Sequence, residues 1–306
     1  MKIWFLICFS ALFVLSACGG APELLLSPAA QQTGVEGARG PYGVSMRRWM
    51  FQARITEGAQ VDVLYPSDAQ GELDRTKAPY PVVLFIHGGL VRAVRYRWLA
   101  QHIASRGYVV LMSSHLADLA LAQSDNSLFA LDDFRKRTSN RQSPLYGAHD
   151  TSQPVAVMGH SLGGVTSVTD WMVRKEIKGL CLLGAWPASS DPIEIEATRS
   201  VLSLTGQHDE RSTPARVLEG FQQFKGEGYY AVIDDMNHFD WTDNASASEL
   251  ATDGPAAKDL AQSRTHAQHV IDSWLDMVLK NDSAAQKLIE RGAFKGISSW
   301  TKGAVQ

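Results

Sequence analysis

The chain has 306 residues, of which 45% are hydrophobic and 20% are charged. This length and composition suit one large α/β domain, and they exclude a disordered chain or a polytopic membrane protein. Its 29 Lys and Arg residues nearly balance 32 Asp and Glu residues, which leaves a formal net charge of −3. Because nucleic-acid phosphates require a basic binding surface, we expect no nucleic-acid partner.

The N-terminal residues resemble a bacterial lipoprotein signal. Lys2 precedes residues 3–15, an apolar run interrupted by one serine, which is short for a membrane span but suits a signal peptide. The run ends in Leu15-Ser16-Ala17-Cys18, where a Leu and two small residues precede a Cys. By this resemblance residues 1–17 are a signal peptide, and Cys18 is the lipidated N-terminal residue. The alternatives are an ordinary signal peptide or an uncleaved anchor that ends in Cys.

This resemblance implies export and attachment to a bacterial membrane, either at its periplasmic face or in the outer membrane. Gly19 follows the cysteine where an Asp would favour retention, so the outer membrane is favoured. With Cys18 lipidated and Cys8 removed, the mature chain keeps Cys181 as a free thiol. We therefore expect no intramolecular disulfide.

We interpret residues 18–40 as a tether and residues 41–306 as one catalytic domain. Residues 21–40 are rich in Gly, Ala, Pro and Gln and show no sustained period. Beyond Tyr42, short apolar runs typical of strands alternate with helical patterns. The expected strands are 61–65, 82–86, 108–112, 155–158, 180–183, 201–205 and 229–233, and the expected helices are 96–105, 128–137, 162–173, 214–224 and 256–279. Apolar strands separated by helices indicate a mostly parallel sheet with helices on both faces.

A candidate nucleophile follows the expected strand 155–158. The sequence there is Gly159-His160-Ser161-Leu162-Gly163-Gly164, and a helix is expected directly after it. A Gly-x-Ser-x-Gly sequence between a buried strand and a helix is typical of a nucleophile elbow. Such a turn holds the serine hydroxyl at a helix N-terminus, where developing negative charge is stabilised. Ser161 is therefore the expected nucleophile, and a purely structural turn is the alternative.

A serine hydroxyl needs a base, usually a histidine that a carboxylate orients. His160 adjoins Ser161, so its side chain points away from the hydroxyl, and His87 lies far upstream. In this architecture the triad follows the order serine, acid, histidine, which favours a late histidine in a loop after a strand. His238 meets this condition, because it follows the expected strand 229–233.

The acid is expected between the serine and the histidine, at the end of a strand. Asp209 fits, because Gly206-Gln207-His208-Asp209 forms a tight turn after the expected strand 201–205. Asp234 and Asp235 precede His238 too closely to reach its far ring nitrogen easily, and Asp191 follows an earlier strand. We select Asp209 and keep the other three as alternatives.

A second loop offers an oxyanion hole. The expected strand 82–86 ends in His87-Gly88-Gly89-Leu90, where small residues let a backbone N–H approach a substrate oxygen. We select the N–H groups of Gly89 and Leu162 as oxyanion donors and Leu90 as a substrate contact. A plain turn is the alternative.

Two further histidines could mimic a metal site. His266 and His269 lie three residues apart in the last expected helix. Since no third ligand lies nearby in sequence, a solvated helix face is the better interpretation. We expect neither a metal nor another cofactor.

From about residue 61 to residue 279 the chain resembles the α/β-hydrolase superfamily. Within it, the chain is similar to the branch of dienelactone hydrolases, platelet-activating-factor acetylhydrolase-like enzymes and bacterial cutinases or polyester hydrolases. The matching stretches are residues 63–66, 81–89, 106–110, 159–164, 206–214 and 237–240. The resemblance implies an α/β-hydrolase fold and the catalytic roles already given to Ser161, His238 and Asp209. Because residues 184–200 are too few for a helical lid, we expect no large cap domain.

Trp186 follows a strand at the place where polyester hydrolases carry a substrate-stacking tryptophan. A buried packing residue is the alternative. The chain departs from the branch in two ways. Gly89 stands where an aromatic residue is usual, and the C-terminal disulfide is absent. Because of these departures, the resemblance does not decide whether the substrate is a polyester.

Three functions follow from these features. The first is a monomeric, lipid-anchored serine esterase that cleaves a small or polymeric ester through an acyl-enzyme intermediate. The second is a catalytically inactive hydrolase fold that serves as a binding lipoprotein, although a complete triad argues against it. The third is an amidase or peptidase, which shares the nucleophile, base and oxyanion hole of an esterase.

Overall fold

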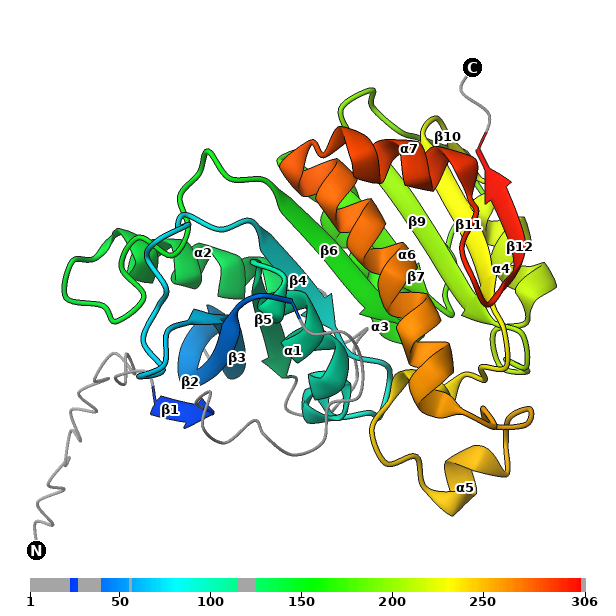
Figure 1. Ribbon diagram of the computed structural model, residues 1–306, viewed down its shortest axis with the longest axis horizontal. Coiled ribbons are helices and arrows are strands. Elements are labelled where there is room, and N and C mark those ends of the chain that lie inside the picture. Colours follow the sequence, from blue (N-terminus) through cyan, green and yellow to red (C-terminus); the bar gives the residue numbers. More distant parts are fainter. Residues whose placement is uncertain (1–22, 27–39, 55–56, 115–124, 304–306) are drawn as a thin grey trace, which may run out of the picture.

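The computed structural model describes the backbone of residues 23–26, 40–54, 57–114 and 125–303. Ten strands form the main sheet in the order β1-β2-β3-β5-β4-β6-β7-β9-β11-β12 (Figure 1). The six strands from β5 to β11 in this order are parallel, and the other pairs are antiparallel. The strands are β1 (Glu23–Leu26), β2 (Gly43–Arg54), β3 (Glu57–Ser67), β4 (Val82–Ile86), β5 (Val109–Ser114), β6 (Val155–His160), β7 (Ile177–Leu183), β9 (Ser200–Gly206), β11 (Gly228–Ile233) and β12 (Ile297–Lys302), with a small second sheet of β8 (Ile193–Glu194) and β10 (Phe224–Lys225).

Helices cover both faces of the sheet, as predicted. They are η2 (Ala93–Tyr96), α1 (Arg97–Ser105), α2 (Asn126–Ser139), α3 (Leu162–Val173), α4 (Pro214–Phe221), η4 (Phe239–Trp241), α5 (Ala247–Leu250), α6 (Leu260–Lys280) and α7 (Ser283–Arg291). One buried apolar cluster joins the sheet to Phe134 of α2, Trp171 of α3 and Phe221 of α4. A second cluster joins it to Leu99 of α1 and Trp274 of α6, which crosses in front of the sheet in Figure 1.

The expected α/β-hydrolase architecture is confirmed, and the described residues form no large cap. Residues 184–199 connect β7 to β9, all of them are described, and they contain the two-residue strand β8 but no helix. The carboxyl ends of the parallel strands meet at one edge of the sheet, where α5 also lies (Figure 1). This edge is the usual location of a site in an open α/β sheet.

The N-terminal part of the sheet differs from the sequence prediction. β1 lies inside the expected tether and pairs with β2, which was not predicted at all. Two adjacent arginines, Arg47 and Arg48, interrupt the apolar pattern of β2. Arg47 is nevertheless buried, because its guanidinium donates a 3.0 Å hydrogen bond to the Tyr65 hydroxyl and forms a 3.0 Å ion pair with Glu72. A strand that contains buried, paired charges therefore lacks the hydrophobicity pattern by which strands are predicted.

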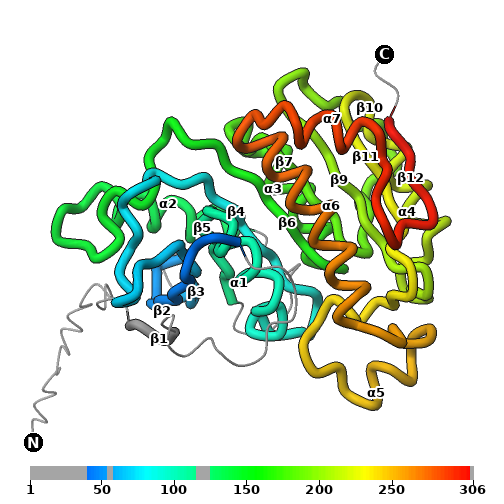
Figure 2. The backbone as a smooth tube through the Cα atoms, in the orientation of Figure 1, coloured from blue at the N-terminus to red at the C-terminus, as the bar shows by residue number. Residues whose placement is uncertain are grey.

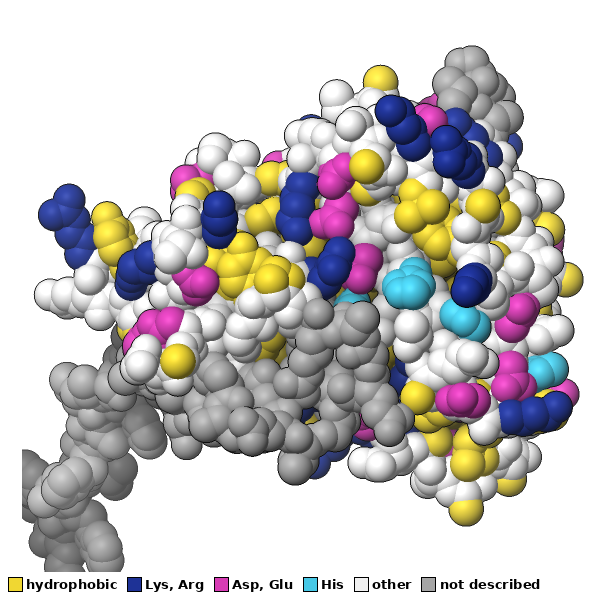
Figure 3. Space-filling view, in the orientation of Figure 1, with side chains coloured by type: hydrophobic (Ala, Val, Ile, Leu, Met, Phe, Trp, Pro, Cys, Tyr) yellow, Lys and Arg dark blue, Asp and Glu magenta, His cyan; other side chains and the backbone are white. Residues whose placement is uncertain are grey.

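Basic and acidic side chains interleave on the face that α6 covers (Figure 3). Arg106 lies 3.5 Å from both Asp272 and Asp276, and Lys280 lies 2.9 Å from Asp276. The basic partners are each 35% exposed, whereas Asp272 is buried, so these ion pairs lie partly within the surface. Among the helices that the structure describes, none is both long and apolar enough to cross a membrane.

Candidate active site

Five loops meet at the carboxyl edge of the sheet. They follow β4, β6, β7, β9 and β11, which are neighbours in the sheet in this order. The loops carry Gly89, Ser161, Trp186, Asp209 and His238, respectively. The topology therefore gathers candidates that are far apart in the sequence.

Ser161 occupies a strained turn between β6 and α3. Its backbone has φ 54° and ψ −126°, a conformation that residues other than glycine rarely adopt. The Ser161 N–H donates a 2.9 Å hydrogen bond to the carbonyl of Leu183 in β7, which fixes the turn to the neighbouring strand. A Cβ atom on Gly163 would collide with the carbonyls of Ile86 and His87, so the turn fits only without a side chain there. This geometry is that of a nucleophile elbow.

Asp209 and His238 form a buried pair beside this turn. Asp209 Oδ2 lies 2.9 Å from His238 Nδ1, and the residues are only 2% and 3% exposed. The backbone N–H of Ser212 donates to Asp209 Oδ1 at 2.5 Å. Because an ionised carboxylate only accepts hydrogen bonds, Nδ1 carries the proton, and Nε2 is left as the acceptor that a base requires.

Gly184 supports this pair from the end of β7. Its φ is +53°, and a Cβ atom built on it would lie 2.9 Å from Asp209 Oδ2 and 3.2 Å from His238 Nδ1. A side chain there would push against the atoms that form the carboxylate–imidazole hydrogen bond. Gly184 thus has a role at the site that the sequence analysis missed.

His160 lies behind His238 and contributes no charge. The two imidazole rings pack with their centroids 4.5 Å apart. Burial, together with the repulsion expected from a charged His238, lowers the pKa of His160 well below its usual value. His160 therefore remains neutral and does not oppose a positive charge on His238 during a reaction.

The loop after β4 turns sharply at Gly89 and Leu90. The N–H of Val91 donates to the Gly88 carbonyl at 3.3 Å, and Leu90 has φ +60°. The Gly88 N–H is engaged at 3.0 Å by the Tyr96 hydroxyl, which also lies 2.8 Å from His160 Nδ1. Of the two glycines, Gly89 is therefore the one whose N–H is not already held by Tyr96.

Leu162 begins α3 directly after Ser161. The first N–H groups of a helix have no partner inside it, so the Leu162 N–H is suited to bind an oxyanion. The Leu162 side chain occupies the space that a side chain at residue 89 would fill, since a Cβ on Gly89 would collide with Leu162 Cδ1. Leu90 and Leu162 are 75% and 40% exposed, which makes the mouth of the site apolar.

Trp186 is half-buried two residues beyond Gly184. Its side chain packs against Gly220 of α4, where an added Cβ would collide with it. The Arg216 guanidinium lies 5.2 Å from the centre of the Trp186 ring. Trp186 is thus a packing residue that is only half-buried, and its role in stacking on a substrate stays a prediction.

The alternative acids lie elsewhere. Asp191 is exposed in the loop after β7, and Asp234 and Asp235 are half-exposed after β11. None of these three has the hydrogen bond to His238 Nδ1 that Asp209 makes. Cys18, the predicted lipidation site, lies outside the described residues.

His266 and His269 both lie on α6. Over the described ranges, no group of three His, Cys, Asp or Glu side chains is placed to hold a metal ion. Cys181 is a buried free thiol, and burial raises its pKa far above the usual value. A thiol in this state is a poor nucleophile, so Cys181 is not a candidate for nucleophilic catalysis.

Two more residues at the site were missed by sequence analysis. Tyr96 fixes the loop after β4, and Asp253 accepts a 2.6 Å hydrogen bond from the backbone N–H of His238. Neither belongs to a motif, because both act through contacts that form only when distant segments fold together. A glycine directly after an apolar strand was the available signal for Gly184, but nothing local marks Asp253.

Comparison with known protein families matches residues 23–252 to a family described as PET hydrolase-like. The matched range covers most of the chain and includes Ser161, Asp209 and His238. It ends one residue before Asp253. A comparison with curated proteins gave no match.

Proposed function

Because the chain belongs to the PET hydrolase-like family, and is therefore a carboxylic ester hydrolase, we propose that it cleaves esters through an acyl-enzyme on Ser161. The observation that carries the proposal is the buried Asp209–His238 pair beside a strained serine at one edge of the sheet. A serine, an oriented imidazole and a carboxylate in this arrangement are the parts of a catalytic triad. The alternatives of a binding module or an amidase become outcomes of the test below.

In the first half of the reaction, Ser161 Oγ attacks the carbonyl carbon of the ester while its proton moves to His238 Nε2. The resulting imidazolium is stabilised by Asp209, which accepts the hydrogen bond from Nδ1. Collapse of the tetrahedral intermediate breaks the bond to the alcohol, which leaves with the proton from His238. The acyl group stays on Ser161.

In the second half, water attacks the acyl carbon and gives its proton to His238. The bond to Ser161 Oγ then breaks, Ser161 recovers the proton, and the carboxylic acid leaves. The N–H groups of Gly89 and Leu162 stabilise the negative oxygen in both halves. Each lost donor of this kind typically lowers kcat by about 10²–10³.

The site mouth favours esters with an apolar group next to the carbonyl. Leu90 and Leu162 border the expected position of the oxyanion, and both are well exposed. Gly89 supplies no aromatic ring at this point, so stacking would rest on Trp186, whose ring Arg216 approaches. We therefore propose small or polymeric esters with an apolar acyl group, and aromatic polyesters as one member of this class.

The test is hydrolysis of p-nitrophenyl esters of graded acyl length by the purified protein, with Ser161→Ala as control. We expect turnover with acetate and butyrate that the control lacks. A matching p-nitroanilide separates esterase from amidase. No turnover of any ester by the wild-type protein would favour the binding module instead.

We further propose that Cys18 carries a lipid that holds the enzyme, as a monomer, at a bacterial membrane facing the periplasm or in the outer membrane. The support is the Leu15-Ser16-Ala17-Cys18 sequence after an apolar run. Cys18→Ser should release the protein into the aqueous phase of a detergent partition, because a hydroxyl cannot take the thioether-linked lipid. Equal partitioning of both forms would refute the anchor.

A further inference from the structure

One segment after η4 runs alongside the loops of the candidate site. Residues 242–254 leave the sheet edge, form α5 and return toward the loops after β9 and β11 (Figure 2). We call residues 242–254 the α5 segment. It contacts the loops that carry His238 and Asp209 and, at Arg95, the 3-10 helix η2, through hydrogen bonds that involve side chains.

Asp253 lies at the end of the α5 segment and bridges two catalytic loops. Its Oδ2 accepts hydrogen bonds from the N–H groups of His238 at 2.6 Å and Phe239 at 3.3 Å. Its Oδ1 accepts from the N–H of Glu210 at 2.9 Å. Glu210 directly follows Asp209. One carboxylate therefore holds the backbone beside the base and the backbone beside the acid.

Side chains within the His238 loop bind several of its N–H groups as well. Asn237 Oδ1 accepts from the N–H groups of Phe239 and Asp240, both at 3.0 Å. Asp240 Oδ2 accepts from the Asn237 N–H at 2.8 Å, and Asn237 Nδ2 donates to the Gly254 carbonyl at 2.9 Å. The loop that carries the base thus depends on side-chain acceptors rather than on pairing between strands.

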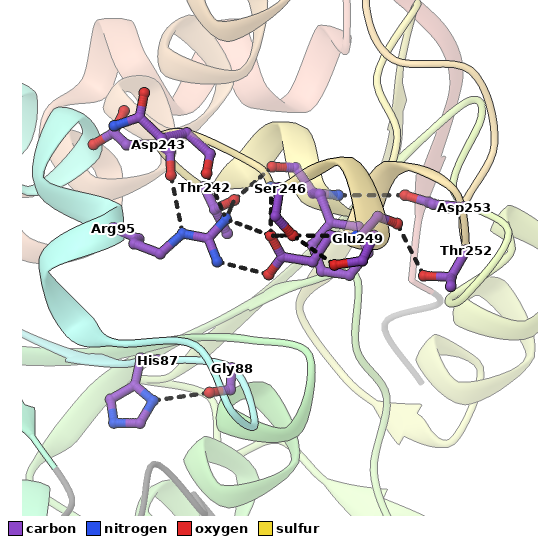
Figure 4. Close-up of polar contacts among 12 residues, drawn as sticks. His87, Gly88, Arg95, Thr242, Asp243, Ser246, Glu249, Thr252 and Asp253 are labelled. Carbon is purple, nitrogen blue, oxygen red and sulfur yellow. Dashed lines mark hydrogen bonds and ion pairs between the residues drawn. The ribbon is translucent and has the colours of Figure 1, made fainter.

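Arg95 anchors the other end of the α5 segment (Figure 4). It lies in η2, just beyond the loop that carries Gly89. Its guanidinium binds both carboxylate oxygens of Glu249, at 2.6 and 2.9 Å, and donates to the Thr242 hydroxyl at 2.9 Å. The hydrogen bonds from Arg95 lower the pKa of Glu249 to about 2, so this ion pair persists through the physiological range. A bidentate pair of this kind fixes orientation as well as distance.

We propose that Asp253 is a positioning residue, which sets the distance between the base His238 and the acid Asp209 for ester hydrolysis. The Arg95–Glu249 pair holds the α5 segment so that Asp253 can do this. The proposal rests on the triad proposed above. Asp253 lies just beyond residues 23–252, so it is a feature of this chain outside the region matched to the family.

The expected effect is moderate because another contact joins the same loops. The His208 N–H donates to the Met236 carbonyl at 2.8 Å, and this bond does not involve Asp253. Without Asp253, the loops should stay near each other but lose their precise register. A displacement of about 1 Å at a catalytic group typically costs about 10²-fold in rate.

The experiment compares Asp253→Ala and Asp253→Asn with Asp282→Ala as matched control. Asp282 Oδ1 accepts two backbone N–H bonds, as Asp253 Oδ2 does, at 2.7 and 3.1 Å from Ala284 and Ala285, but it caps α7 away from the site. The measurements are kcat and KM on p-nitrophenyl acetate, the rate of fluorophosphonate labelling, and the Tm. All rates are normalised to the folded fraction.

For Asp253→Ala we expect kcat and the labelling rate to fall together by about 10²-fold, with little change in KM. Asp253→Asn should recover part of the loss, because one acceptor oxygen remains. Asp282→Ala should lower only the Tm. Wild-type kcat in Asp253→Ala would overturn the proposal, and if this variant does not fold, wild-type kcat in Asp253→Asn would do so. Turnover that survives Ser161→Ala would instead overturn the triad.

Discussion

The Ser161 elbow and the His238 loop are positioned by different means. The elbow is held by backbone contacts, with Ser161 hydrogen-bonded to β7 and Gly163 packed against the end of β4. The His238 loop is held by side chains, chiefly the acceptors of Asn237, Asp240 and Asp253. A turn that is held by its backbone requires only a short sequence motif. A loop that is held by side chains also requires partners from other segments of the chain.

The difference matters for how each part responds to substitution. In the elbow, an added side chain is harmful because there is no space for it. In the His238 loop, a removed side chain is harmful because a buried N–H loses its acceptor. The following predictions use this contrast, starting from the largest effect.

Removing a reacting group should have the same effect on kcat in both regions, however each region is held. We expect Ser161→Ala and His238→Ala each to lower kcat by about 10⁴–10⁶, because triad members act as a unit. The measurement is kcat on p-nitrophenyl acetate, with circular dichroism as the folding control. A loss below about 100-fold in either variant would mean that another residue supplies that role.

A buried carboxylate in α3 offers a second contrast. Both oxygens of Asp253 accept hydrogen bonds, whereas Asp170 accepts one from Ser127 and its Oδ1 has no partner in the described structure. Burial raises the pKa of Asp170 from 3.8 to about 7, so the folded state retains a proton that the unfolded state releases. Stability should therefore fall as pH rises across this window, by about 1.4 kcal/mol per pH unit and about 4 kcal/mol in total.

The variant Asp170→Asn cannot titrate, so it should lose this dependence. Unfolding in urea at pH 5 and pH 8 measures the effect. We expect the stability of the wild-type protein to fall between these values more steeply than that of the variant. Equal slopes would show that Asp170 is ionised in the folded state at both pH values.

Adding one methyl group should damage the elbow. In Gly163→Ala the new Cβ meets the carbonyls of Ile86 and His87, so α3 must move from β4. We expect a loss of about 3 kcal/mol in the free energy of unfolding. Gly58→Ala is the control, because its Cβ would make only ordinary contacts, at 3.6 Å to Met50 Cε and 3.9 Å to the Phe51 carbonyl oxygen. If both substitutions are tolerated equally, close packing is not what holds the elbow.

Removing one side chain should damage the His238 loop. Asn237→Ala takes the acceptor from the Asp240 N–H and the donor from the Gly254 carbonyl. Leaving such buried groups without a partner costs about 1–3 kcal/mol, and we expect a fall in kcat as well because His238 is the next residue. Urea unfolding and kcat measure the two effects. If stability falls but kcat is unchanged, Asn237 stabilises the loop without placing His238, and the predicted effect on kcat is wrong.

The same contrast explains what the sequence could predict. The elbow was found because its glycines and serine form a local pattern between a strand and a helix. Asp209 and His238 were selected by chain order and by their places after strands, which the topology then brings together. Asp253 could not be found in this way, since its partners are 14, 15 and 43 residues away in sequence.

Element boundaries show a similar limit. The last long helix begins at Leu260 rather than at residue 256, because Asp259 caps it by accepting from the Gln262 N–H at 3.0 Å. Helix α4 ends at Phe221 rather than at residue 224, where Phe224 pairs with Ile193 in the second sheet. β12 was missed because it is an edge strand whose side chains are exposed or half-buried, so it has no apolar run.

The most direct test of the central claim is covalent labelling of the nucleophile. A fluorophosphonate probe is added to the wild-type protein and to Ser161→Ala, and the products are mapped by peptide mass spectrometry. We predict a single adduct on Ser161 in the wild-type protein and none in the variant, because an activated serine displaces fluoride from phosphorus. An adduct that persists in Ser161→Ala, or that maps to another residue of the wild-type protein, would contradict the assignment of Ser161.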